Sequence, residues 1–116
     1  MAALVLAAAV TLSGECSFLG LDCELAVART CANRMADDRW PSDLEAVLEG
    51  YYGRGTPTDT ALMLAYVLVT RPEALSDGRT FYAYSDADRA RMGAVGEQTI
   101  CKAGLCLHLS GTWMGR

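Results

Sequence analysis

The sequence predicts an α+β fold that is mostly helical, a lysozyme-like helical domain with at most a small β-sheet. An apolar, alanine-rich opening and four further segments bearing helix start and stop residues predict helices, whereas a single short run has strand-like composition. The chain has 116 residues, of which 52% are hydrophobic and 21% charged, as is typical of a globular domain. We therefore expect one domain over residues 1–116.

The first ten residues, MAALVLAAAV, predict a buried helix, because alanine is the best helix former. The same run resembles the apolar part of a secretory signal. No Lys or Arg precedes it, however, as a signal peptide normally requires, so the helix is the preferred interpretation. The run is also too short to cross a bilayer, and we expect no membrane span.

Three helices should follow in the first two thirds of the chain. Asp22 is expected to cap a helix that ends near Met35. Residues 42–45, Ser-Asp-Leu-Glu, have the form of a capping box before a short helix that Gly50 ends. In residues 56–72, a capping threonine (Thr56), a first-turn proline and an early acid precede an apolar run that ends at proline. That run has little polar face, so it is expected to be the central buried helix.

The C-terminal part combines a short helix with the only strand candidates. Ser85 and Asp88 mark the start of a short helix ending near Gly93. Residues 80–84, which follow a Ser-Asp-Gly turn, have strand composition. Residues 99–113 are expected either to pair with them as a small sheet or to lie as a loop.

The charge pattern excludes one class of partner. The net charge is −4 and no basic run occurs anywhere, whereas nucleic-acid binding needs a clustered cationic surface. The same acidic balance gives no electrostatic attraction toward an anionic polymer such as a cell wall.

Five cysteines are many for so short a chain, and an odd number cannot all pair within it. We predict at most two disulfides, Cys101–Cys106 and Cys16–Cys23, with Cys31 as a buried thiol. The alternative is a zinc site made of Cys101, Cys106 and His108, but this spacing matches no familiar zinc pattern. We therefore predict neither a metal nor another cofactor.

Few residues are candidates for catalysis. There is one histidine and no Ser or Cys in a recognisable nucleophile motif, so triad chemistry has little support. The glycine-rich segment 50–55 lacks the strand and the lysine of a phosphate-binding loop. What remains is Glu15, which follows the apolar helix through Ser13-Gly14. A carboxyl held against apolar neighbours is suited to act as a general acid, although a lone Glu after a helix is more often a solvated surface group.

The segment from Glu15 onward resembles the opening motif of the spore-cortex-lytic, or cell wall hydrolase, family. There, a catalytic glutamate precedes a helix with an Ala-Val-Ala stretch that ends in Asn-Arg and an apolar residue. Here these features are Glu15, residues 26–28 and residues 33–35, without an insertion between them. Further similar segments follow in the family's order: 40–48, 61–69, 78–84 and the histidine at 107–109.

This resemblance implies cleavage of the glycan strands of peptidoglycan, by a lytic transglycosylase or a muramidase-type glycosidase, with Glu15 as the single general acid and base. It implies a cell-wall location, extracytoplasmic or phage-delivered. The family usually has a second acid four residues after the catalytic one, and this chain has Leu19 there. Asp22 is the nearby acid, with capping as its preferred role and an electrostatic role toward substrate as the alternative.

Four tyrosines are candidates for stacking on sugar rings, with packing as an equally supported alternative. They are Tyr51, Tyr52, Tyr82 and Tyr84. Asn33 and Arg34 are expected to satisfy the last carbonyls of their helix rather than to contact substrate.

Two other functions stay open. The first is a catalytically weakened relative that binds glycan or a partner, which the missing second acid favours. The second is a small cysteine-rich zinc or redox protein.

Overall fold

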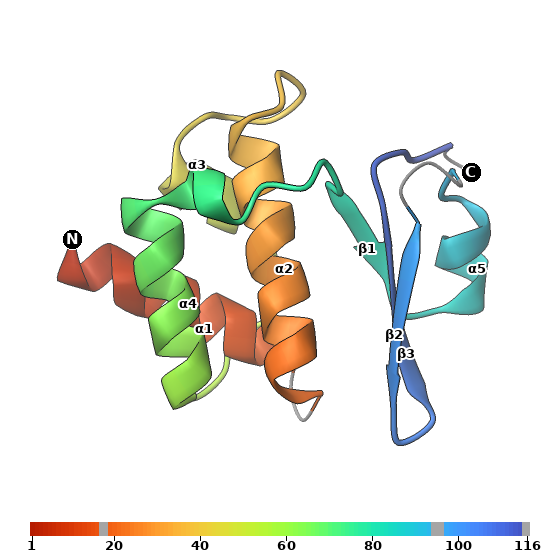
Figure 1. Cartoon of the computed structure of the whole chain (residues 1–116), viewed down its shortest axis with the longest axis horizontal. Helices are drawn as coiled ribbons and strands as arrows, with labels where there is room; N and C mark the ends of the chain where they lie inside the picture. The colour runs from red at the N-terminus through yellow and green to blue at the C-terminus, as the bar shows by residue number, and fades with distance from the viewer. Residues whose placement is uncertain (17–18, 94–96, 115–116) are drawn as a thin grey trace.

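The computed structural model describes residues 1–16, 19–93 and 97–114. Helices α1 to α4 pack together, and a small sheet with α5 lies on the other side of α2, which confirms the mostly helical α+β prediction (Figure 1). The helices are α1 (Ala2–Cys16), α2 (Gly20–Met35), α3 (Leu44–Leu48), α4 (Asp59–Thr70), α5 (Asp86–Ala90) and the 3₁₀-helix η1 (Pro72–Ala74). The strands are β1 (Phe81–Ala83), β2 (Gln98–Lys102) and β3 (Leu105–Ser110).

Helix α1 contains the whole alanine-rich run, as predicted, and continues to Cys16. Its second half is the buried part: Ala8, Ala9 and Leu12 are fully covered, whereas Leu6 is 53% exposed. Within the part of the chain that the structure describes, no helix combines the length and the apolarity needed to cross a membrane.

The central helix is α2, and the prediction that the apolar run of α4 would be central is wrong. Helix α2 packs against α1, α3, α4 and β1 and buries nine residues. Helix α4 buries only Ala61, Ala65 and Leu68 and leaves Met63 70% and Tyr66 54% exposed. A run that is apolar on every side has no polar face to show which side is covered, so its neighbours decide its burial.

The helix starts differ from three expectations. Helix α2 begins at Gly20, so Asp22 lies within its first turn and caps nothing. Asp43 precedes α3 without a side-chain cap, and Ser42 forms no capping box. Thr58, not Thr56, caps α4 by accepting a hydrogen bond from the Ala61 N–H at 3.0 Å. Ser85 caps α5 through the Asp88 N–H, as predicted.

The three strands form an antiparallel sheet in the order β1-β3-β2, so the C-terminal segment does pair with the aromatic strand. Ala103 and Gly104 make the turn between β2 and β3 with φ of 53° and 81°. Two positive φ values are what a tight hairpin turn requires. The hairpin sets Cys101 directly opposite Cys106.

Both predicted disulfides are present, Cys16–Cys23 and Cys101–Cys106, and Cys31 is a buried free thiol. The zinc alternative is contradicted, because two of its three ligands are joined to each other as a disulfide. In the described ranges, no group of three His, Cys, Asp or Glu side chains could hold a metal ion.

Candidate active site

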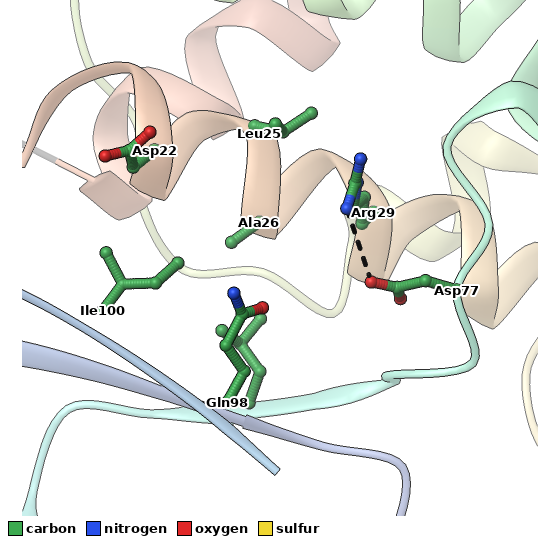
Figure 2. A pocket seen from close by; sticks show the side chains of 8 residues that line it. Asp22, Leu25, Ala26, Arg29, Asp77, Gln98 and Ile100 are labelled. Carbon is green, nitrogen blue, oxygen red and sulfur yellow. Dashed lines mark ion pairs between the residues drawn. The ribbon is translucent and has the colours of Figure 1, made fainter. Parts of the chain in front are cut away.

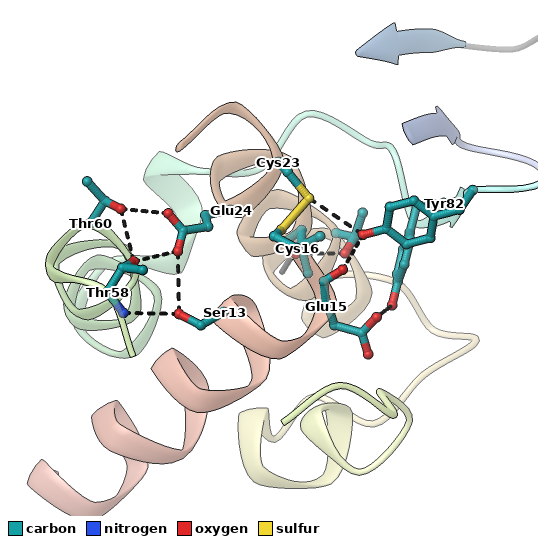
Figure 3. Close-up of a disulfide and its surroundings, with 11 residues drawn as sticks. Ser13, Glu15, Cys16, Cys23, Glu24, Thr58, Thr60 and Tyr82 are labelled. Carbon is teal, nitrogen blue, oxygen red and sulfur yellow. Dashed lines mark hydrogen bonds between the residues drawn. A yellow bond between two sulfur atoms is a disulfide. The ribbon is translucent and has the colours of Figure 1, made fainter. Parts of the chain in front are cut away.

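Glu15 lies in the last turn of α1, at the end of the helix where the sequence placed it. Its Oε1 accepts a hydrogen bond from the Gly53 N–H at 2.7 Å. Its Oε2 accepts one from the Tyr82 hydroxyl, also at 2.7 Å (Figure 3). Both partners lie outside α2: Gly53 belongs to the loop after α3, and Tyr82 belongs to β1. The carboxyl is thus held between the helical layer and the sheet.

The glycine-rich segment 50–55 packs closely against the backbone of α1. A Cβ atom on Gly53 would lie 2.4 Å from the Glu15 backbone nitrogen, and one on Gly14 would lie 2.1 Å from the Arg54 nitrogen. The Gly55 N–H also donates to the Val10 carbonyl at 3.0 Å. Two backbones approach here as only glycine permits, and this contact brings the Gly53 N–H to the Glu15 carboxylate.

Tyr82 is half-buried, and its ring stacks on Tyr51 with centroids 5.8 Å apart and planes 14° apart. Burial first, and then the charge of Glu15, raise the pKa of Tyr82 far above its ordinary value. Its hydroxyl therefore stays protonated at neutral pH and remains a donor to the carboxylate.

Tyr84 is 40% exposed, and its hydroxyl donates to the Glu15 backbone carbonyl. The same hydroxyl lies 3.5 Å from the Cys23 sulfur, beside the disulfide that Cys16 forms next to Glu15. Burial, followed by the charge of Glu15, raises the pKa of Tyr84 as well. Tyr82 of β1 and Tyr84, which directly follows this strand, thus meet the end of α1.

Asn33 and Arg34 do not satisfy carbonyls at the end of α2, and this expectation is wrong. Asn33 is buried and holds the turn before β1: it donates to the Asp77 carboxylate and the Arg79 carbonyl and accepts from the N–H groups of Asp77 and Gly78. Arg34 donates to the Thr80 carbonyl at 2.7 Å.

Arg34 also places its guanidinium over three aromatic rings, 4.7 Å from the centroid of Tyr51, 5.2 Å from that of Trp40 and 5.9 Å from that of Tyr82. Asn33 and Arg34 together fix the path and orientation of the strand that carries Tyr82. Asn33 and Arg34 thus help to position Tyr82, which in turn donates a hydrogen bond to Glu15.

The structure separates the other predicted site residues. Tyr51 is 2% exposed and its hydroxyl hydrogen-bonds to Thr30 at 2.7 Å, so it has the packing role that was the alternative for these tyrosines. Tyr52 directly precedes Gly53 but is 97% exposed and is not among the described hydrogen-bond partners of Glu15. Asp22 lines a pocket between α2 and the sheet.

Sequence reasoning missed Glu24. This carboxylate is 2% exposed and accepts hydrogen bonds from Thr58 and Thr60 at 2.6 Å each and from Ser13 at 3.4 Å (Figure 3). Glu24 thus joins α2 to α1 and to the start of α4. Its partner on α1, Ser13, lies two residues before Glu15. A charged residue on the same helical face as Ala28 and Cys31 was the available signal, because a carboxylate on an apolar face needs buried partners.

His108 lies on β3, where its Nδ1 is 2.9 Å from the Thr99 hydroxyl oxygen. It is 6% exposed and, with Tyr84, lines a hollow of about 480 Å³ beside the β2–β3 hairpin. His108 is not among the described hydrogen-bond partners of Glu15.

The arrangement suits proton transfer by a single carboxyl. Among the described residues that hydrogen-bond to Glu15, none carries a second carboxyl. Comparison with known proteins adds nothing to this geometry: no family model, no curated protein and no solved structure matches the chain.

Proposed function

We propose that this protein cleaves the glycan strands of peptidoglycan, with Glu15 as its general acid and base. The observation that carries the proposal is the setting of Glu15. Its carboxyl stands at a helix end, half-exposed, with each oxygen fixed by one neutral donor. A group held in this way is positioned for proton transfer rather than left to rotate in solvent.

A single carboxyl is sufficient for one of the two chemistries. Glycoside hydrolysis normally uses two carboxylates that flank the scissile bond. In a lytic transglycosylase the sugar's own hydroxyl attacks the anomeric carbon, so no water must be activated. Glu15 would protonate the leaving glycosidic oxygen and then accept the proton of the attacking hydroxyl.

The hydrogen bond between Tyr82 and Glu15 is compatible with both halves of this cycle. A phenol can donate to a carboxylate, and its oxygen can accept from a carboxylic acid. Tyr82 can therefore hold the Glu15 side chain in place whether or not the carboxyl carries a proton. Gly53 supplies the second fixed point through its backbone.

The resemblance to cell wall hydrolases supports the same proposal, because each residue of the motif has a structural role around Glu15. The glutamate is the held carboxyl, and Asn33 and Arg34 orient the strand that holds it. Two disulfides favour an oxidising compartment. An extracytoplasmic or phage-delivered site of action at the cell wall belongs to the proposal.

The test is cleavage of purified peptidoglycan by wild type and by Glu15→Gln. Glutamine keeps an oxygen that can accept from Gly53 but cannot deliver a proton, so the rate should fall about 10²–10⁴-fold with little change in stability. Glu49→Gln, on an exposed acid after α3, is the matched control and should cleave like wild type. Retained cleavage in Glu15→Gln would remove the proposal.

Product analysis separates the two chemistries. Anhydro-sugar ends would identify a transglycosylase, and new reducing ends a hydrolase. Comparable losses in Glu15→Gln and Asp22→Asn would point to a two-carboxylate hydrolase.

A second candidate function rests on Leu19, which stands where the family usually has its second acid. A weakened relative would bind glycan without cutting it. Sedimentation with insoluble peptidoglycan, in the absence of any released fragments, would favour this binding function.

A further inference from the structure

A pocket of about 290 Å³ lies between α2 and the sheet, away from the hydrogen-bond partners of Glu15. We call it the α2–β2 pocket. Its size is near the lower end of about 300–1,000 Å³ that is usual for small-ligand sites. Its walls are Asp22, Leu25, Ala26 and Arg29 of α2, Asp77 of the turn before β1, and Gln98, Ile100 and Leu109 of the sheet (Figure 2).

The charges in this pocket are separated along one face of α2. Asp22 and Arg29 are seven residues apart, which is two helix turns, or about 10 Å at 1.5 Å per residue. Leu25 and Ala26 lie between them, and Figure 2 shows Asp22 and Arg29 toward opposite ends of the pocket. An anion and a cation thus stand at the two ends of an apolar middle.

Neither charge has a strong partner in the described part of the protein. Asp22 is exposed and forms no ion pair there; Lys102, whose Nζ lies near Gly20, does not reach it. Arg29 approaches Asp77 only at 3.7 Å, and its buried Nε–H has no acceptor. A close guanidinium–carboxylate pair is about 2.7–2.9 Å.

Asp77 is committed to other groups. Its carboxylate accepts from Asn33 at 2.6 Å and from the Arg79 guanidinium at 3.1 Å. It therefore has little capacity left to satisfy Arg29. The guanidinium of Arg29 has donors to spare for a carboxylate that enters the pocket.

We propose that the α2–β2 pocket binds a short peptide that carries an ammonium group and a carboxylate, with the ammonium at Asp22 and the carboxylate at Arg29. The apolar middle would take the peptide's aliphatic part. About 10 Å is the reach of roughly three extended residues at 3.3–3.6 Å each, or of a lysine side chain together with the residue after it.

The identity of the natural ligand rests on the proposed function. Peptidoglycan strands carry short peptides whose amino terminus is tied to a sugar. In those peptides the free ammonium belongs to the side chain of a diamino acid, and the free carboxylate to the peptide's end. The pocket would then select glycan strands that bear peptides over bare strands.

The direct test is an NMR titration of the whole protein with the peptide N-acetyl-L-Ala-D-isoglutaminyl-L-Lys-D-Ala, whose only free carboxylate is its C-terminus, up to millimolar concentration. We expect saturable shifts at Leu25, Ile100 and Leu109. Acetylating the lysine side chain, or amidating the C-terminus, should each weaken binding about tenfold, because each removes one charged hydrogen bond.

Protein variants assign the two ends. In Asp22→Asn, acetylating the lysine should cause no further loss; in Arg29→Gln, amidating the C-terminus should cause none. Arg71→Gln, on an exposed arginine after α4, is the matched control and should bind like wild type. Absence of saturable binding, or binding that is indifferent to both variants, overturns the proposal.

Peptide binding at the α2–β2 pocket should be independent of catalysis. Glu15→Gln should bind the peptide as wild type does, so binding without cleavage would count against the proposed function alone. Cleavage of peptide-bearing and peptide-stripped glycan at equal rates, with no peptide binding, would count against the pocket alone.

Discussion

At the scale of single residues, two carboxylates in this protein have opposite surroundings. Glu15 is half-exposed and is held by a backbone N–H and a phenol. Glu24 is buried and is held by hydroxyl groups of three residues. In the proposed function the first exchanges a proton with the glycan, whereas the second joins α1, α2 and the start of α4. Substitutions at Tyr82 and Glu24 test this division.

Tyr82→Phe should lower the rate of glycan cleavage about tenfold or more. The change removes one hydrogen bond to a charged group, typically worth about 1.5–3 kcal/mol, while the ring can still stack on Tyr51. The measurement is kcat on purified glycan strands, together with the midpoint of urea unfolding. Tyr84→Phe loses a bond to the Glu15 backbone rather than to its carboxylate, so its rate should fall less. Equal losses in the two variants would contradict the role given to Tyr82.

Glu24→Gln should instead lower stability and leave the activity of the folded protein near that of wild type. Thr58 and Thr60 both donate to the carboxylate, and an amide offers only one oxygen, so one hydroxyl must turn to accept from the new NH₂ group. We expect a loss of about 1–3 kcal/mol in the free energy of unfolding, measured by urea denaturation. A loss of activity as large as that of Glu15→Gln, without destabilisation, would make Glu24 the catalytic acid.

At the scale of elements, the site depends on how a loop and a strand are brought to the end of α1. The loop approaches through Gly14, Gly53 and Gly55, and the strand is oriented by Asn33 and Arg34 from the end of α2. None of these five residues needs to touch a substrate. Their substitution should nevertheless disturb Glu15.

Gly53→Ala should destabilise the protein by about 3 kcal/mol or more and lower cleavage. Its Cβ would lie 2.4 Å from the Glu15 nitrogen and 2.5 Å from the Gly14 carbonyl carbon, which are backbone atoms that cannot move aside cheaply. Gly50→Ala is the matched control, because the nearest atom to its Cβ would be 3.4 Å away, an ordinary contact. Thermal unfolding of both variants is the measurement. Similar midpoints in the two would contradict a close approach of the loop and α1.

The sequence predicted the elements well where a short-range signal marked them. Ser85 caps α5, the alanine-rich run is helical, and Cys101 and Cys106 pair across a tight turn. It failed where a long-range contact decides the outcome. Three helix starts moved by one to three residues, and α2 became central instead of α4, because burial depends on neighbours that local patterns do not specify.

The same distinction applies to the site. Glu15 was found through its place in a motif, but its partners Gly53 and Tyr82 lie 38 and 67 residues away along the chain. Asn33 was given a local role at its helix end, whereas its amide binds a turn more than forty residues further on. Side chains that connect distant segments carry no local signature.

At the scale of the whole molecule, the cysteines divide into two crosslinks and one buried thiol. Cys31 is fully buried, so the folded, unreduced protein should show almost no reaction with a thiol reagent. Unfolding in urea without reductant should expose one thiol per chain, and unfolding with reductant should expose all five. Thiol titration and intact mass before and after alkylation are the measurements. Three or more thiols without reductant would contradict the disulfides.

Global stability should fall at alkaline pH, because several buried groups resist losing their protons. Burial raises the pKa of Cys31 from an ordinary value of 9.0 to about 11. Burial also raises the pKa of Tyr51, Tyr82 and Tyr84 above their ordinary value of 10.0. At pH 8 and below, nearly all of these four groups are protonated in both the folded and the unfolded state, and their contribution is complete. As the pH rises, the unfolded chain releases protons that the folded protein keeps, so unfolding becomes easier.

Cys31→Ala isolates the share of the thiol. At pH 10 the unfolded thiol is mostly ionised and the folded one is not, which should lower the wild-type free energy of unfolding by about 1.4 kcal/mol relative to pH 8. The three tyrosines add a further loss at pH 10, because each is about half ionised in the unfolded chain and stays protonated in the folded protein. Urea denaturation at pH 8 and pH 10 should therefore show a drop in both proteins that is about 1.4 kcal/mol smaller in Cys31→Ala. The alanine variant starts from a lower stability, because a buried sulfur is lost, but the comparison is between the two pH values within each protein. Equal drops in wild type and variant would show that the thiol ionises alike in the folded and unfolded states, which would contradict the full burial of Cys31.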